Sequence, residues 1–298
     1  SSEGQIDLYR YCQREKRTFI EVLESFPSAV PSLSYLVELI PRLRSRQFSI
    51  SSSQRIPPNV AEITVAFVDY KTPYDRRKLG ICSEFLKSKI PQKIETSDES
   101  KSDSMLSKQS STTNSDDHHT ISNSVSIWIQ KGTFRKPRDW FQRPLILVGP
   151  GTGLAPFKAM IEQRSTLRQT NPTNEMGQIA LFLGHRLSAK DYLYDNTTWQ
   201  SYLSDGTLSH LFVAFSRDQK PKRYVQHLLL EQSSLVWSIL NDQNGLFLLA
   251  GSANQMPKDV RDSMCLIFQQ EGKLSEDDSE RLLLKFEKQR RYQTETWS

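Results

Sequence analysis

Cysteine is scarce in this sequence, whose 298 residues include only three, Cys12, Cys82 and Cys265. The three lie far apart, form no CxxC pair and have no histidine nearby at ligand spacing. Disulfide frameworks and zinc sites need such clusters. The sequence therefore argues against both, and we predict no metal site.

Long hydrophobic runs are also lacking. No run of about 18 apolar residues occurs, and residues 1–17 lack the apolar core of a signal peptide. The sequence therefore predicts no membrane partner and no secretion, and we expect a cytoplasmic protein. Residue 1 is Ser rather than Met, and the opening segment has the pattern of a helix inside a domain. We interpret the sequence as a fragment.

The charge is modest, with 39 Lys and Arg against 34 Asp and Glu, a net charge of +5. The cations are scattered and lack the interleaved aromatic residues of a nucleic-acid platform, so we expect no nucleic-acid partner. The positive balance favours phosphates or an acidic partner.

A serine-rich segment interrupts the chain. Residues 97–126 contain eleven serines and hardly any apolar side chains, so they cannot bury enough surface to offset the entropy of ordering. We predict a disordered insertion over residues 91–125. His118 and His119 lie inside it, and we interpret them as solvated loop residues rather than metal ligands.

The first half has weak periodic patterns. Apolar spacing predicts helices over residues 15–25 and 33–43. Extended segments are predicted at 46–52, 62–70 and 125–132, from alternating, β-branched and aromatic residues. We expect helices followed by a small antiparallel barrel.

The second half changes character. Four short, continuously apolar runs occur at residues 144–149, 178–185, 210–216 and 245–251. Segments long enough for helices follow, among them 156–168, 222–240 and 257–271. This alternation predicts a parallel sheet covered on both faces. We place the domain boundary between the two halves, giving domains 1–143 and 144–298.

A glycine-rich turn follows the first apolar run, in "LILVGPGTGLAPFKAM". The strand should end at Val148, and Gly149, Gly151 and Gly153 allow tight turning and close approach of a ligand before a helix begins around Pro156. Amides at a helix start attract phosphate. The spacing departs from G-x-G-x-x-G, so a turn without a ligand stays an alternative.

Cations follow the third apolar run, in "SRDQKPKRYVQ". Ser216, Arg217 and Lys222 suit the 2'-phosphate of NADPH, whereas NAD sites place an acid at this position. Asp218 is the one acid available, and the cations outnumber it. The alternative is a solvated charged loop; together with the glycine turn, the pattern favours NADPH.

These segments resemble a known family. "RQFSISS" (46–52), "GICSEFL" (80–86) and "GPGTGLAPF" (149–157) look like the flavin segment, the pyrophosphate turn and the nicotinamide-nucleotide turn of the ferredoxin-NADP reductase module of diflavin reductases such as cytochrome P450 reductase. Later blocks also match, including the ending "RRYQTETWS" (290–298). The resemblance implies an α/β plus β fold: part of a helical connecting region with an antiparallel FAD-binding barrel, then a parallel-sheet NADPH-binding domain.

Within this family, one branch is most similar. The sequence resembles the NADPH-dependent diflavin oxidoreductases of cytosolic iron–sulfur cluster assembly in three features. They are Ala250, at a position where most members carry Cys, the "TETW" ending, and the opening residues 3–28. The resemblance implies an enzyme that transfers hydride from NADPH to FAD. Electrons would then pass through FMN, in a flavodoxin-like domain absent from this sequence, to an anamorsin-type Fe–S protein. A truncated non-catalytic interaction module and a P450- or sulfite-reductase-type electron donor are the alternatives; Ala250 argues against the latter.

The resemblance also implies FAD-binding residues. Arg46 would neutralise a flavin phosphate, Phe48 would stack on the flavin ring, and Ser49 would hydrogen-bond near flavin N5. The FAD pyrophosphate would be held by Gly80, Ile81, Cys82 and Ser83. Glu295 matches a C-terminal acid of the family and could assist Ser49 in proton movement. Trp297 would cover the flavin and swing aside for hydride transfer.

On the NADPH side, the resemblance implies a second group. Gly151, Thr152 and Gly153 would meet the pyrophosphate. The 2'-phosphate and adenine would be bound by Ser216, Arg217, Lys222, Tyr224 and Gln226. Arg186 could reach the cofactor phosphates, with a surface ion pair as the alternative. Asp259 has an equal claim to cofactor binding and to a role as a helix-start acid.

Overall fold

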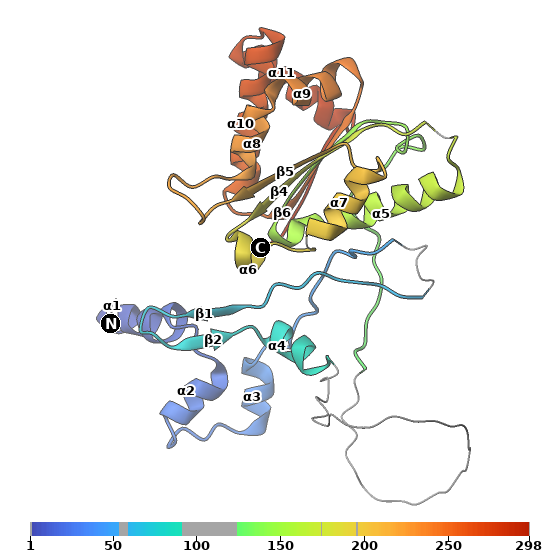
Figure 1. Ribbon diagram of the computed structural model, residues 1–298. Coiled ribbons are helices and arrows are strands. Elements are labelled where there is room, and N and C mark those ends of the chain that lie inside the picture. The colour runs from blue at the N-terminus through green and yellow to red at the C-terminus, as the bar shows by residue number, and fades with distance from the viewer. Residues whose placement is uncertain (1, 54–58, 91–123, 174, 195, 298) are drawn as a thin grey trace, which may run out of the picture. The chain divides into compact units, whose positions relative to one another are not determined.

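The computed structural model describes residues 2–53, 59–90, 124–173, 175–194 and 196–297 (Figure 1). Residues 91–123 of the predicted insertion, with His118 and His119, lie outside this range. The chain forms two compact units, one of residues 1–46 and 66–129 and one of residues 47–65 and 130–298. The domain boundary at residues 143 and 144 stays a prediction.

The first unit contains short helices and one β-hairpin. Its elements are α1 (Ser2–Leu8), a π-helical turn η1 (Tyr9–Arg14), α2 (Phe19–Ser25), α3 (Leu33–Leu39), β1 (Asp69–Lys71), β2 (Arg77–Leu79) and α4 (Ile81–Ser88). A capping box starts α2: Thr18 accepts from the amide of Glu21, and the Glu21 carboxylate accepts from the amide of Thr18. The helices predicted over 15–25 and 33–43 are therefore confirmed, in shorter form.

The predicted antiparallel barrel is not confirmed. Among the described residues, this part of the chain has the antiparallel pair β1–β2 and one isolated bridge, between Ile50 and Ile63. The strand predicted over 62–70 begins only at Asp69, and the strand predicted over 125–132 is wrong. Strand propensity reflects packing on a half-buried pleated surface. Among the residues that the structure describes, no strand pairs with residues 125–132, where Ile127 and Ile129 are more than 70% exposed.

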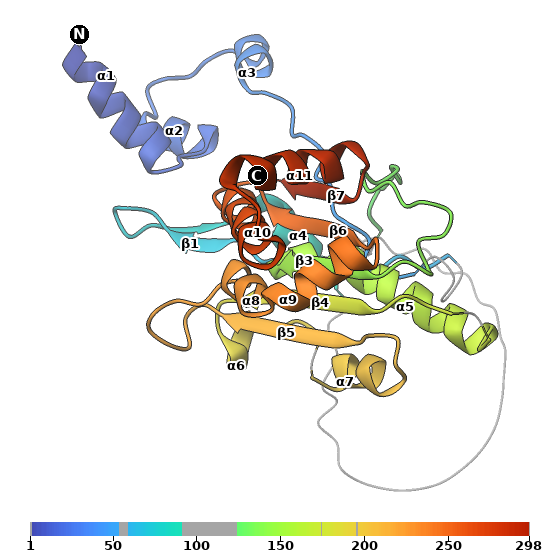
Figure 2. The same ribbon diagram turned by 90° about the horizontal axis from the view of Figure 1, so that it is seen from above.

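The second unit contains a five-stranded sheet in the order β5-β4-β3-β6-β7, with every neighbouring pair parallel (Figures 1 and 2). The strands are β3 (Leu145–Pro150), β4 (Ile179–His185), β5 (His210–Phe215), β6 (Leu246–Ser252) and β7 (Tyr292–Trp297). The four predicted apolar strands are confirmed, and β7 is an additional edge strand.

Helices cover both faces of this sheet (Figure 2). They are α5 (Ala155–Thr170), preceded by the 3₁₀ turn η2 (Gly151–Leu154), α6 (Ser188–Asp191), α7 (Asn196–Ser204), α8 (Val225–Glu231), α9 (Ser233–Trp237), the π-helical turn η3 (Ser238–Asp242), α10 (Met256–Gly272) and α11 (Glu276–Lys288). Leu145 and Leu147 pack with α5 and α7 residues, whereas Ile146 and Val148 pack with α8, α10 and α11. The continuous apolar runs are thus explained by burial on two faces. No helix of the described residues is both long and apolar enough to cross a membrane.

Arg164 is a buried cation on α5 with only 1% of its surface exposed. Its guanidinium donates to the backbone carbonyls of Trp140 at 2.6 Å, Arg143 at 2.7 Å and Gly177 at 2.5 Å. Burial lowers its pKa to about 10, so the group stays charged at neutral pH. Arg164 therefore fixes the loop before β3 and the loop before β4 to α5.

Replacing Arg164 by methionine should lower the free energy of unfolding by about 3 kcal/mol or more, because three buried carbonyls would lose their donor. Urea unfolding of the two proteins measures the difference. Arg168→Met is the matched control, since Arg168 makes one exposed bond to the carbonyl of Gly206. Its effect should stay within about 1 kcal/mol; equal losses in the two variants would contradict the explanation.

Candidate functional site

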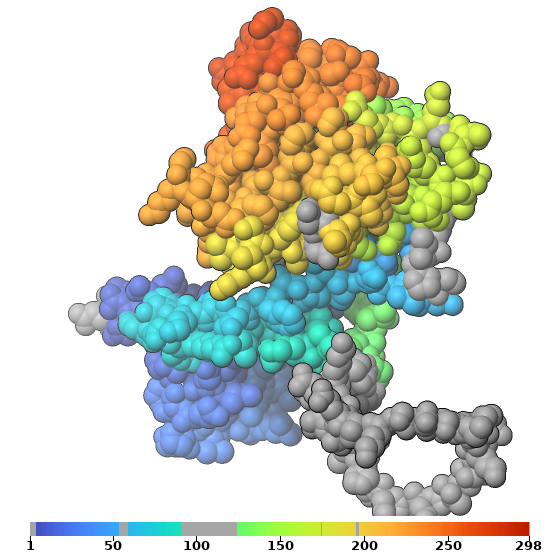
Figure 3. All heavy atoms as spheres, in the orientation of Figure 1, coloured from blue at the N-terminus to red at the C-terminus, as the bar shows by residue number. Residues whose placement is uncertain are grey.

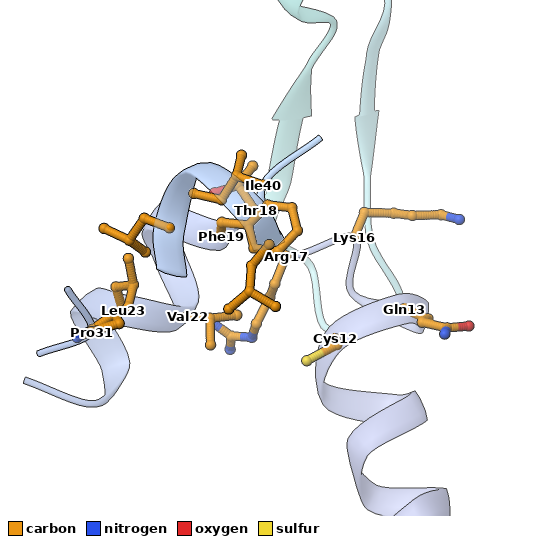
Figure 4. A pocket seen from close by; sticks show the side chains of 12 residues that line it. Cys12, Gln13, Lys16, Arg17, Thr18, Phe19, Val22, Leu23, Pro31 and Ile40 are labelled. Atoms are coloured by element: carbon orange, nitrogen blue, oxygen red, sulfur yellow. The ribbon is translucent and has the colours of Figure 1, made fainter. Parts of the chain in front are cut away.

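Two pockets lie away from the predicted site residues. One, of about 620 Å³, lies in the first unit and is lined by mainly apolar side chains around α2 and α3, with Cys12 and Arg17 at its wall (Figure 4). The other, of about 500 Å³, is open and lies beside Trp237 and Arg281. Neither contains a residue predicted to bind a cofactor, so the candidate site is the carboxyl edge of the sheet.

The glycine turn after β3 has one open and one crowded position. Gly151 has a φ of +58°, and a Cβ added there would meet no atom within 4 Å. A Cβ added at Gly153 would lie 2.0 Å from the carbonyl oxygen of Ala250. Gly153 is therefore required by packing against β6, whereas Gly151 leaves the outer side of the turn open to a ligand.

Anions should bind at this turn. The amide of Ala155 already donates to the carbonyl of Thr152, and Pro156 has no amide hydrogen, so the amides without an intrahelical acceptor are those that open the turn η2. Neither η2 nor the first turn of α5 has an acidic residue. Half-buried Thr152 lies in the same turn. Backbone donors, a hydroxyl and open space are the features that a pyrophosphate needs, and its binding at this turn stays a prediction.

The ends of β4 and β5 bring two predicted cations together. The amide of Ser216 donates to the carbonyl of His185 at 2.9 Å, and the amide of Arg217 donates to the carbonyl of Arg186 at 2.8 Å. The Arg186 guanidinium lies 3.4 Å from the Asp191 carboxylate, so the ion pair considered for this residue is present. Its side chain is well exposed, which limits the strength of that pair.

Asp218, the one acid in the loop after β5, is already bound. Its carboxylate accepts from the amide of Ser188 at 3.2 and 3.3 Å, at the start of α6. By contrast, Arg217 and Lys222 have no acidic partner within the described ranges. This loop, residues 216–224, projects from the unit (Figures 1 and 3). Uncompensated cations in an exposed loop fit a phosphate group.

Three further predicted residues lie near α8 and α10. Tyr224, 40% exposed, precedes α8, and its amide donates to Nδ1 of His227 at 3.0 Å. The amide nitrogen of Gln226 donates to Asp259 at 3.2 Å, and that of Gln255 donates to the other carboxylate oxygen at 2.9 Å. Asp259 lies in the first turn of α10, where a negative charge complements the helix dipole.

A second group of predicted residues meets at β7. The Ser49 hydroxyl donates to Oε1 of Glu295 at 3.2 Å. The other carboxylate oxygen accepts from the amide of Thr133 at 3.3 Å and from the Thr133 hydroxyl. Sequence reasoning missed Thr133, because no motif includes it. Phe48, next to Ser49, is 37% exposed, so its ring has a free surface for stacking.

Trp297 has a fixed backbone and a partly free side chain. Its carbonyl accepts from the amide of Ala253 at 2.8 Å, and the residue is 37% exposed. Ala250 is fully buried and pairs in register with Glu295. Any movement of Trp297 would therefore be a rotation of the side chain rather than a release of the chain end.

The remaining predicted FAD residues belong to the first unit. The amide of Gly80 donates to the carbonyl of Val68 at 2.8 Å, and the Ser83 hydroxyl donates to the carbonyl of Gly80 at 3.1 Å. The amides of Ile81 and Cys82 start α4 and have no intrahelical acceptor. These amides fit a phosphate, whereas Ser83 is buried and engaged in the turn.

Arg46 also belongs to the first unit. It is exposed, and its guanidinium donates to the carbonyl of Arg44. Phe48 and Ser49 belong to the second unit, and each unit is described by itself. The described residues contain no cluster of three His, Cys, Asp or Glu able to hold a metal ion.

His185 is buried at the end of β4, with 6% of its surface exposed. Its Nε2 has no hydrogen-bond partner among the described residues, and its ring lies 5.4 Å from that of Tyr192. Burial lowers its pKa to about 4, against the raising effect of the Asp191 charge. The neutral ring is therefore the folded form down to acid pH.

Stability should fall as pH drops from about 6.5 to about 4, because unfolded His185 binds a proton that the folded protein excludes. Above pH 6.5 both states are neutral and the penalty vanishes. The slope from this residue should approach 1.4 kcal/mol per pH unit. Urea unfolding at a series of pH values should show a smaller slope for His185→Phe. Half-buried His210 offers the control His210→Gln; an unchanged slope in His185→Phe would disprove the assignment.

Two protein families match this chain, one in its first part and one in its second. Residues 1–85 match the FAD binding domain family, and residues 147–262 match the oxidoreductase NAD-binding domain family. Fold and matches define the class: an oxidoreductase with FAD- and NAD(P)-binding domains.

Curated relatives narrow the class. The chain is 38% identical over 297 residues to NADPH-dependent diflavin oxidoreductase 1 of Xenopus laevis, covering 99% of this chain and 43% of the relative. It is 36% identical over 305 residues to the protein of that name in Arabidopsis thaliana, covering 100% and 43%. It is 36% identical over 298 residues to NADPH–cytochrome P450 reductase of Drosophila melanogaster, covering 100% and 39%. The chain is similar to diflavin reductases over nearly its whole length, and it spans less than half the length of these relatives.

Proposed function

We propose that this chain is a reductase module that transfers hydride from NADPH to FAD. The observation that carries the proposal is the grouping at one edge of the sheet: the open turn at Gly151 packs through Gly153 against β6, and β6 pairs with the strand that carries Glu295. Ser49, hydrogen-bonded to Glu295, belongs to the predicted flavin segment. One strand, β6, therefore separates the turn that we propose to bind phosphate from the strand that carries Glu295.

FAD, when bound, accepts hydride and releases electrons singly. Phe48 would stack on its ring and Arg46 would neutralise a phosphate. The amides of Ile81 and Cys82, in the turn formed by Gly80 and Ser83, would hold the pyrophosphate. Division into domains 1–143 and 144–298 is part of the same proposal.

NADPH would lie along the sheet edge. Gly151, Thr152 and Gly153 would hold the pyrophosphate, and Arg186 could reach it if it left Asp191. Ser216, Arg217 and Lys222 would bind the 2'-phosphate, with Tyr224 and Gln226 beside the adenine. Asp259 would act by holding Gln226, with which it shares a hydrogen bond.

Ser49 and Glu295 would assist proton movement, and Trp297 would control access to the flavin. The Ser49 hydroxyl, held by the Glu295 carboxylate, would place a proton near flavin N5. Trp297 would cover the flavin face and rotate away for nicotinamide. The neighbouring Ala250 offers no thiol, so Ser49 and Glu295 would be left to assist proton movement near N5.

For the longer protein, we infer that electrons continue through an FMN-binding flavodoxin-like domain to an anamorsin-type Fe–S protein in cytosolic iron–sulfur cluster assembly. This inference rests on the similarity to diflavin reductases and on the features shared with that branch, Ala250 among them. Adding purified acceptors to the full-length protein tests it: reduction of a haem protein but not of an Fe–S protein would refute it.

Titration of the chain with FAD and NADPH tests the core of the proposal. A yellow protein should form, and NADPH should bleach its flavin absorbance in the absence of oxygen. Failure of NADPH to bleach a protein that has bound FAD would refute hydride transfer. Failure to bind FAD would favour the non-catalytic interaction module.

A further inference from the structure

A buried lysine lies on the helix that starts at the glycine turn. Lys158, on α5, has only 6% of its surface exposed. Its Nζ donates to Oε2 of Glu62 at 3.0 Å and to the backbone carbonyl of Ser51 at 3.3 Å. It also lies 3.6 Å from Oε1 of Glu162 and 5.0 Å from the centroid of the Tyr194 ring. Neither the cofactor motifs nor the proposed chemistry uses this residue.

The partners of Lys158 belong to the segment that carries the predicted flavin residues. Ser51 and Ser53 are buried, at 0% and 3% exposure. The amide of Ser51 donates to the carbonyl of Glu62 at 2.8 Å, and the amide of Ser53 donates to the Glu162 carboxylate. One turn of α5, from Lys158 to Glu162, therefore holds both parts of the segment, around Ser51 and around Glu62, through donor and acceptor groups.

The lysine is charged in the folded protein. Burial alone would lower its pKa, but the hydrogen bond to Glu62 and the charges of Glu162 and Glu62 outweigh burial and raise it. A buried ammonium with fixed acceptors holds its partners in one arrangement. Removal of one member would leave buried polar groups without partners.

We infer that Lys158 is a positioning residue, which fixes Phe48 and Ser49 to the helix that begins at the Gly151–Gly153 turn and so sets the distance between the flavin and nicotinamide sites. Ser49 lies two residues before Ser51, and Lys158 lies in the first turns of α5. Hydride transfer is sensitive to displacements of about 1 Å. The inference rests on the proposed function, since it assigns the two sites to FAD and NADPH.

Amide hydrogen exchange of the cofactor-free chain tests the attachment without any reaction. In Lys158→Met, exchange at the amides of Ser51 and Ser53 should rise about tenfold or more, while exchange in β3 stays unchanged. Lys158→Arg should keep most of the protection. Lys288→Met is the control, because Lys288 is exposed in the last turn of α11. Unchanged exchange in folded Lys158→Met would overturn the inference, whatever the activity.

Anaerobic hydride transfer tests the positioning role. In FAD-loaded Lys158→Met, the rate of hydride transfer at saturating NADPH should fall about tenfold, while KM for NADPH stays within about twofold of the wild-type value. Lys158→Arg should recover the rate. A loss confined to KM, or no recovery with arginine, would overturn it. If Lys158→Met does not fold, Glu62→Gln takes its place, because Glu62 is half-exposed and keeps the lysine; it should slow transfer about threefold. If wild-type protein binds FAD but NADPH does not reduce it, the proposed function is refuted. The hydrogen-exchange results would still show whether Lys158 holds the segment of Ser51 and Ser53 to α5.

Discussion

Gly153→Ala is expected to abolish stable folding of the sheet unit. The added Cβ would lie 2.0 Å from the carbonyl oxygen and 2.7 Å from the carbonyl carbon of Ala250. Both atoms belong to β6, which pairs with β3 on one side and β7 on the other, so neither can move without breaking the sheet. The cost should exceed the 1–3 kcal/mol typical of overpacking. Urea unfolding followed by circular dichroism measures it.

Gly151→Ala is the matched control in the same turn. Its Cβ would meet no atom within 4 Å, and its φ of +58° should cost alanine about 1–2 kcal/mol. This variant should fold, and it should bind NADPH more weakly because the methyl group projects into the open side of the turn. Wild-type stability of Gly153→Ala, or equal losses in the two variants, would contradict the packing role of Gly153.

The sheet was predictable because three of its apolar strands, β3, β4 and β6, are buried on both faces. Leu145 to Val148 are all at 0% exposure, and burial on both faces produces the continuous apolar run that the sequence shows. The edge strand β7 was missed because "YQTETW" alternates polar residues on a half-exposed edge. Its pairing with β6 depends on a long-range register that no local pattern contains.

The barrel was predicted from resemblance and from strand propensity, and propensity alone was insufficient. Residues 125–132 have strand-forming side chains, but a ladder needs a partner at hydrogen-bonding distance, and none pairs with them in the described part of the chain. In the first unit, the hairpin β1–β2 pairs Asp69 with Leu79 and Lys71 with Arg77, and the amide of Thr72 donates to the carbonyl of Arg76 in its turn. No strand was predicted over Arg77–Leu79, so local patterns were insufficient for this hairpin as well.

Some residues of the candidate site were also predictable from the sequence, and others were not. Motifs identified Ser49 and Glu295 separately, and the structure brings them within 3.2 Å. Lys158 was not identified, since a lysine in an amphipathic helix is normally solvated. The role of Asp218 was also open, because its partner, the amide of Ser188, lies at the start of α6, thirty residues away in the sequence. Side chains that act through tertiary contacts leave no local signal.

Removal of Arg217 and Lys222 together is expected to eliminate any preference for NADPH over NADH. Each charge-assisted hydrogen bond to a phosphate contributes about 1.5–3 kcal/mol. Loss of two should therefore raise KM for NADPH by about 10²-fold or more, because each 1.4 kcal/mol is a factor of ten. KM for NADH, which lacks the 2'-phosphate, should change little. Steady-state kinetics with both coenzymes, and titration with NADP⁺ and NAD⁺, measure the effect.

The control for this double variant lies in the same loop. Arg223 is already paired with Glu231, and its Nε lies 3.2 Å from the carboxylate. Arg223→Ala therefore removes one positive charge from the same loop without removing a cation that is free to bind a phosphate. If general attraction of the anionic coenzyme were responsible, Arg223→Ala would weaken NADPH and NADH binding alike. A specific 2'-phosphate site predicts instead that only the Arg217 and Lys222 changes discriminate between the coenzymes. Equal weakening of NADPH and NADH in the double variant would place the phosphate contact elsewhere.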